Sequence, residues 1–149
     1  MQKKILSLII ITLLLSGCFH NNSGKVKLNK EYYNDGSFIK VSSNQINKLK
    51  NDVYILYTYN NFCTFQIPCE DIFSEFMKKR KIDFLSISFE EFRNTYLYDT
   101  VKYAPSVIIV SNGNIIAYLD ANSDDDLDKY QDSSVFEKWI GNYIKSKNR

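Results

Sequence analysis

Residues 53–69 read VYILYTYNNFCTFQIPC, and this stretch decides the fold. Its first seven residues, Val53 to Tyr59, are all aromatic, aliphatic or β-branched. An unbroken run of this kind predicts a strand buried on both faces, as in a sheet that helices cover. A loop with Cys63 follows, and Pro68 then stands where a helix can begin, because proline is favoured in the first helical turn. The stretch therefore predicts a strand, a loop and a helix, with Cys63 and Cys69 around the bend.

Strands and helices alternate outward from this unit. The elements that we expect are, in chain order, a strand at 38–41, a helix to residue 50, a strand at 53–59, a helix at 68–81, a strand at 82–89, a helix at 90–98, strands at 107–110 and 115–119, and a helix at 135–144. Such alternation favours parallel pairing, and Asn112-Gly113 between the last two strands predicts a hairpin with an antiparallel edge. We therefore predict one α/β domain with a central mixed sheet and helices on both faces.

The amino-terminal stretch has the layout of an export signal. Lys3 and Lys4 precede an apolar run from Ile5 to Leu15, which is too short to span a bilayer but typical of a signal peptide. The sequence Leu15-Ser16-Gly17-Cys18 resembles the bacterial lipobox, in which the cysteine receives diacylglycerol before cleavage. The resemblance implies that residues 1–17 are removed and that Cys18 becomes the lipidated first residue. The alternative is a signal anchor with an incidental cysteine.

The export signal also predicts how the rest of the chain is placed. We expect residues 18–36 to be the lipidated cysteine and a flexible tether, because they are polar, and residues 37–149 to be the domain. Cleavage would remove Lys3 and Lys4 and lower the formal charge from +2 to 0. With no polybasic patch expected, attachment would rest on the acyl chains. The predicted location is the extracytoplasmic face of the cell membrane.

Composition excludes several classes of protein. Hydrophobic residues make up 44% of the 149 and aromatic residues 15%, which excludes extended disorder. A formal charge of +2 is too small to indicate nucleic-acid binding, and a single histidine excludes a histidine-rich metal centre. An alternation of oxygen-bearing side chains invites a calcium interpretation, at Asp120, Asn122, Asp124, Asp126 and Asp128. That segment lacks the glycine and the closing glutamate of an EF-hand, so we expect a solvated loop and predict neither metal nor cofactor.

The two cysteines that remain after Cys18 are Cys63 and Cys69. Because disulfides persist outside the cytoplasm, the predicted export favours a disulfide between these two cysteines or a reduced dithiol pair. In one continuous helix they would lie about 9 Å apart along the axis, more than the 4.4–6.8 Å between Cα atoms that a disulfide tolerates. Pro68 disfavours helix at Ile67, so a looped Cys63 can reach its partner. A reversible disulfide, a static bridge and no bond all remain open.

Helix position bears on the reactivity of Cys69. The first turn of a helix stabilises an anion, so we expect the pKa of the Cys69 thiol to fall below its usual value of about 8.5. Glu70 and Asp71 work against that lowering. Tyr54, Tyr57 and Tyr59 are expected in the core, because aromatic residues in a buried strand usually pack there.

Three features resemble the thioredoxin superfamily over residues 37–146: the order of elements, the cysteine loop that opens a helix, and Ala104-Pro105-Ser106 before the hairpin strands. Extracytoplasmic lipoproteins with such domains, including the bacteriocin transport accessory group, look similar. The resemblance implies a thioredoxin-like fold with Cys63 and Cys69 as the redox pair. It also implies a cis bond at Pro105, where the backbone of Ala104 would pair with an extended substrate strand.

Two departures from the family pattern bear on function. Five residues separate Cys63 from Cys69, where active thioredoxins have two. The buried aspartate that aids proton transfer in the family is absent, and its position, counted back from Cys63, holds Tyr57. Cys63-Thr64 is also similar to the peroxiredoxin cysteine loop, but the Pro-Thr context before that cysteine is missing.

These observations leave two hypotheses. In the first, the protein is a membrane-anchored thiol-disulfide oxidoreductase that acts on exported proteins. In the second, it is a redox-inactive thioredoxin-like lipoprotein that binds a membrane-associated protein partner within a secretion or transfer apparatus.

Overall fold

A mixed five-stranded sheet forms the centre of the protein, whose computed structural model describes residues 24–60 and 68–147. The strands are β1 (Phe38–Lys40), β2 (Val53–Tyr59), β3 (Phe84–Ser88), β4 (Ser106–Ser111) and β5 (Asn114–Tyr118), in the spatial order β1-β3-β2-β4-β5. β3 pairs in parallel with β1 and β2, whereas β4 is antiparallel to β2 and to β5. The antiparallel part therefore comprises two pairs, one more than the predicted hairpin.

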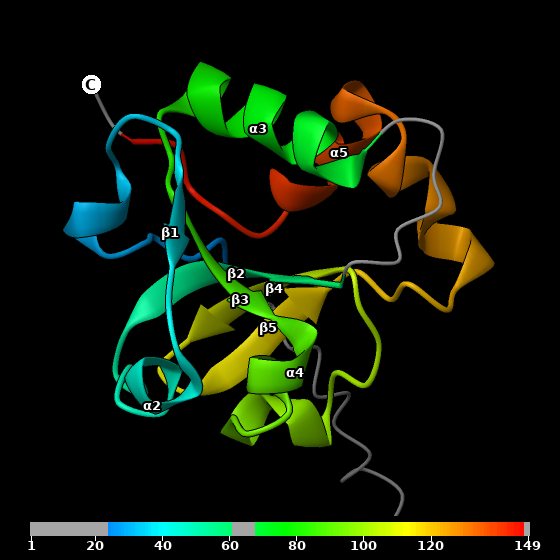
Figure 1. Cartoon of the computed structure of the whole chain (residues 1–149). Coiled ribbons are helices and arrows are strands. Elements are labelled where there is room, and N and C mark those ends of the chain that lie inside the picture. Colours follow the sequence, from blue (N-terminus) through cyan, green and yellow to red (C-terminus); the bar gives the residue numbers. More distant parts are fainter. Residues whose placement is uncertain (1–23, 61–67, 148–149) are drawn as a thin grey trace, which may run out of the picture.

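Helices cover both faces of this sheet, as predicted. They are α2 (Ser43–Ile46), α3 (Cys69–Arg80), α4 (Phe89–Phe92) and α5 (Ser133–Ile140), with 3₁₀ helices at Lys30–Tyr32, Tyr96–Asp99 and Asp124–Tyr130. Figure 1 shows α3 and α5 on one face and α2 and α4 on the other. No helix in the described part of the chain is long and apolar enough to cross a membrane.

The strand β2 has the bounds that the sequence predicts, and it is buried along its length except at its two ends. Its five interior residues are buried, with Ile55 and Leu56 fully so. On α3, an apolar stripe of Ile72, Phe73, Phe76 and Met77 is also buried, and Phe73 packs against Phe136 of α5 with 4.7 Å between ring centroids. Burying this stripe against β2 fixes the position of α3 over the sheet.

The turn between β4 and β5 confirms the hairpin prediction. Asn112 and Gly113 have φ angles of 49° and 76°. Two successive positive values match the two-residue turn whose twist suits an antiparallel pair. The predicted helix at 90–98, in contrast, is split into α4 and the 3₁₀ helix Tyr96–Asp99. Its backbone is interrupted because the Thr95 hydroxyl bonds to the Phe92 carbonyl and the Asn47 side chain accepts the Tyr96 N–H.

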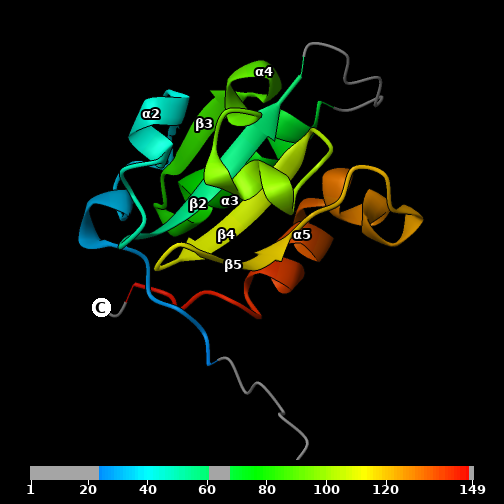
Figure 2. The same cartoon turned by 90° about the horizontal axis from the view of Figure 1, so that it is seen from below.

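The predicted flexible tether is wrong for residues 26–36, which belong to the folded domain. Val26 forms a parallel bridge with Ile144, and Figure 2 shows these two ends of the described chain side by side. Leu28, Tyr32 and Tyr33 are all buried. The domain therefore begins at about residue 26 and not at residue 37.

Asp83 holds this amino-terminal arm to the start of β3. Its carboxylate is only 2% exposed and accepts hydrogen bonds from the backbone N–H groups of Gly36 (2.9 Å) and Ser37 (2.7 Å). Gly36 has a φ of 80°, and a Cβ there would lie 2.4 Å from the Met77 carbonyl oxygen. Glycine at this position lets the arm pass against the end of α3.

Burial of the arm can be tested with Leu28→Ala. We expect the free energy of unfolding in urea to fall by about 2–4 kcal/mol, because a buried leucine loses its contacts and leaves a cavity. Lys27→Ala, at the exposed neighbouring residue, should change it by less than about 0.5 kcal/mol. Equal, small effects would return residues 26–36 to the role of a tether.

Candidate functional site

Cys69 is the first residue of α3 and directly follows Pro68, the N-cap residue. Its side chain is 1% exposed. The positive end of the helix dipole favours an anion at this position. Cys63, Cys18 and the predicted bridge between Cys63 and Cys69 involve residues outside the described ones, so their roles stay predictions.

Tyr57 of β2 contacts Cys69 from below the helix. The Tyr57 hydroxyl lies 3.6 Å from the Cys69 Sγ and donates a hydrogen bond to Glu70 Oε1 over 3.4 Å. The ring is 3% exposed and packs edge-on against Phe73, with 5.4 Å between centroids. As expected, Tyr57 belongs to the core, but its hydroxyl also faces the sulfur.

These three side chains form an ordered chain of proton carriers. With the Tyr57 proton directed at Glu70, the phenolic oxygen is left to accept the proton of a Cys69 thiol. Glu70 is exposed, so it can exchange protons with water. The arrangement can therefore carry a proton from a buried sulfur to solvent.

The Ala104–Pro105 peptide bond is cis, as the resemblance implies. Thr58 of β2 pairs with Ser106 of β4, so this bond lies at the same end of β2 as Tyr57 and Cys69. The Asn60 side chain donates to the Ala104 carbonyl over 2.9 Å. The role of Ala104 and Pro105 in a substrate groove stays a prediction.

Two buried or partly buried donors hold the backbone on either side of this proline. Tyr130 donates its hydroxyl proton to the Pro105 carbonyl over 2.7 Å, while Asn60 binds the carbonyl before it. A carbonyl oxygen has two lone pairs, so Ala104 keeps one acceptor position for an incoming N–H group. Neither Asn60 nor Tyr130 was found from the sequence, because each acts across a long sequence separation and belongs to no local motif.

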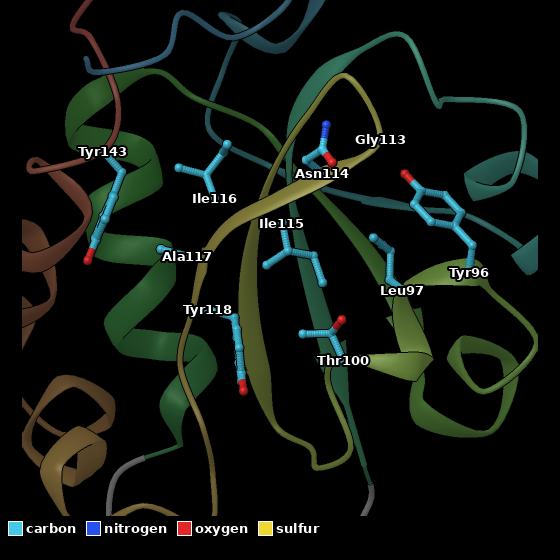
Figure 3. Close-up of a pocket in the computed structure, with 10 residues that line it drawn as sticks. All are labelled: Tyr96, Leu97, Thr100, Gly113, Asn114, Ile115, Ile116, Ala117, Tyr118 and Tyr143. Atoms are coloured by element: carbon cyan, nitrogen blue, oxygen red, sulfur yellow. The ribbon is translucent and has the colours of Figure 1, made fainter. Parts of the chain in front are cut away.

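A groove of about 560 Å³ lies elsewhere, along the edge strand β5. It is lined by Tyr96, Leu97, Thr100, Gly113, Asn114, Ile115, Ile116, Ala117, Tyr118 and Tyr143. Figure 3 shows Tyr143 and Tyr96 on opposite sides of the strand. The groove contains neither Cys69 nor Pro105. Among the described residues, no group of three or more His, Cys, Asp or Glu side chains is suited to a metal ion.

Solved structures resemble the chain, although no protein-family model and no curated protein matches it. A thioredoxin from Halobacterium salinarum is 14% identical with a TM-score of 0.54, and the match covers 77% of this chain and 97% of that one. The thioredoxin NaTrxh from Nicotiana alata is 18% identical with a TM-score of 0.51, covering 72% of this chain and 93% of that one. The chain has a thioredoxin fold.

The predicted fold class is therefore confirmed. At identities this low the likeness shows the fold alone. Resemblance to lipoproteins and to the bacteriocin transport accessory group stays a prediction. Within the thioredoxin fold, this chain places one cysteine, one tyrosine and one cis-proline at the same end of the central strand.

The hydrogen bond from Tyr130 to the proline can be tested by Tyr130→Phe. The Pro105 carbonyl would lose a buried donor, so we expect the free energy of unfolding to fall by about 1–3 kcal/mol. Tyr103→Phe is the matched control because Tyr103 is 51% exposed and should change little. A Tyr130→Phe variant as stable as the Tyr103→Phe variant would mean that this contact does not hold the loop.

Proposed function

We propose that this protein catalyses thiol-disulfide exchange on exported proteins, held at the membrane by a lipid on Cys18. The observation that carries the proposal is the contact between the Tyr57 hydroxyl and Cys69 at the start of α3, at the same end of β2 as a cis-proline. The thioredoxin fold supports exchange chemistry in general terms. Anchoring rests on the lipobox resemblance alone.

The burial of Cys69 supports an order in which the two cysteines would act. At 1% exposure, Cys69 cannot meet a sulfur of another protein, so the attacking thiolate would be that of Cys63. Cys63 would form a mixed disulfide and release the first substrate thiolate. Cys69 would then attack the Cys63 sulfur, release the second substrate thiolate and close the Cys63–Cys69 bond. Two electrons pass to the substrate, and a dithiol reductant restores the pair; an oxidising partner would run the same steps backwards.

Tyr57 would assist the second step, in which Cys69 must lose its proton. The thiol proton passes to the Tyr57 oxygen as the Tyr57 proton passes to Glu70, and the hydroxyl then faces the new thiolate as a donor. Glu70 returns the proton to water. A neutral phenol at this position stabilises the thiolate without the charge repulsion that a carboxylate would add.

The stretched cysteine spacing favours a second candidate function. With five residues between the cysteines, the bond between them could be a static bridge, and the fold would then serve as a binding module for a membrane-associated protein. In that case the groove along β5 is a described surface with room for a partner.

A redox titration of residues 19–149 separates the two candidates. We expect reversible opening of the Cys63–Cys69 bond between roughly −120 and −270 mV, the range of exchange catalysts, and loss of exchange activity in Cys69→Ser. A bond still closed below about −300 mV would favour the binding module. Full activity in Cys69→Ser, or two thiols that never pair, would overturn the proposal.

The role of the hydroxyl is tested by Tyr57→Phe, with Tyr54→Phe as the matched control. Both residues lie on β2, and the Tyr54 hydroxyl contacts the Tyr96 hydroxyl at 3.3 Å instead of a sulfur. We expect exchange to slow by about tenfold or more in Tyr57→Phe, with its pH profile moved to higher pH. Tyr54→Phe should leave rate and profile unchanged. Equal loss in both variants would indicate a packing effect.

A further inference from the structure

The two ends of the domain bring basic residues together. The Val26 N–H donates to the Tyr143 carbonyl over 2.7 Å, and the Lys145 N–H donates to the Val26 carbonyl over 2.8 Å. Lys25, Lys145 and Lys147 line the same hollow beside these paired segments. All three side chains are exposed.

The carboxy-terminal end of α3 completes a basic hollow of about 560 Å³ next to these segments. Its cationic lining residues are Lys25, Lys79, Arg80, Lys145 and Lys147. We call these five residues and the hollow between them the basic face. The floor is partly apolar, with Phe76, Ile82 and Ile144. No stretch of the sequence predicts this face, because it joins three segments that are far apart in the chain.

One carboxylate, Glu137 of α5, opposes the five cations. It accepts a hydrogen bond from Lys79 over 2.7 Å and is also paired with Arg80 over 2.5 Å. The Lys79 hydrogen bond and the Arg80 pair hold the pKa of Glu137 below its usual value, so it stays charged near neutral pH. Even with Glu137 ionised, the basic face carries a surplus of positive charge.

A cluster of acidic residues lies at the other end of α3. Six aspartates and only one lysine lie between residues 120 and 132. Figure 1 shows this segment, in orange, at the end of α3 where Cys69 lies, and the carboxy-terminal segment at the opposite end. The axis of α3 separates Cys69 from Arg80 by about 16 Å. The domain is thus polarised, with the candidate site on its acidic side.

We propose that the basic face lies against an anionic membrane surface, with lipid headgroup phosphates in the hollow. The proposal rests on the lipid anchor of the proposed function. Lys25 follows Cys18 by seven residues, so a lipidated Cys18 would hold it within about 25 Å of the bilayer. A basic surface beside an acyl anchor adds a second attachment, and each lysine near an anionic surface strengthens binding.

This arrangement corrects the expectation that no polybasic patch is left after cleavage. It also has a consequence for the proposed reaction. With the basic face on the lipid, the amino-terminal end of α3 and the cis-proline point away from the membrane, towards exported proteins. The negative charge at 120–132 favours the same orientation, because an anionic surface repels it.

The test uses residues 19–149, which carry no acyl chain. They contain the whole buried core from Leu28 to Ile144. We expect sedimentation with vesicles of mixed phosphatidylglycerol and phosphatidylcholine, none with phosphatidylcholine alone, and release as salt is raised. Lys25→Glu/Lys145→Glu should weaken binding by about tenfold or more. Lys40→Glu/Lys48→Glu, with the same change in net charge at exposed sites outside the basic face, should lose much less.

Three results would overturn the proposal. They are equal binding to both kinds of vesicle, equal loss in the two double variants, and saturation of the hollow by free inorganic phosphate or an acidic peptide with no vesicle binding. Exchange activity measured without vesicles should be unchanged in both double variants. A failure of membrane binding is therefore distinguishable from a failure of the proposed redox function.

Discussion

Burial of β2 on both faces and pairing along both edges is the constraint on which the rest of the structure depends. β3 and β4 bond to its two edges, so its position in the sheet is fixed from both sides. Alternate side chains then point to opposite faces, which aims Tyr57 at the underside of α3. Pairing of Thr58 with Ser106 fixes where the cis-proline lies. Strand register therefore places Tyr57 and the cis-proline at the same end of β2.

Local patterns in the sequence predict those elements that can be recognised without their partners. β2, α3 and the Asn112-Gly113 hairpin are each specified by a run, a stripe or a turn pair that needs no distant partner to be recognised. The amino-terminal arm was missed for the opposite reason. Val26 and Leu28 alternate with lysines in a polar stretch, and their burial depends on a partner segment around Ile144. A pattern of two apolar residues is too short to predict that contact.

The candidate site also has parts that local patterns predict and parts that depend on distant contacts. The sequence indicates Cys69 at a helix start and a proline before β4, and it places Tyr57 where the family has an acid. It cannot show that the hydroxyl meets the sulfur, because this depends on how closely α3 packs on β2. Phe73 sets that distance, since it lies between the Tyr57 ring and Phe136 of α5. The proton path therefore depends on core packing, which the spacing between the cysteines does not predict.

The candidate site and the basic face are connected through the polarity of α3. A helix favours anions at its first turn and cations at its last, and this helix has Cys69 at one end and Lys78, Lys79 and Arg80 at the other. The charges that stabilise the helix therefore also supply part of the surface proposed to meet the membrane. Because both ends belong to one rigid element, fixing the basic end against lipid would fix the direction in which Cys69 lies. Orientation at the membrane and chemistry at the cysteine would then follow from the same twelve residues.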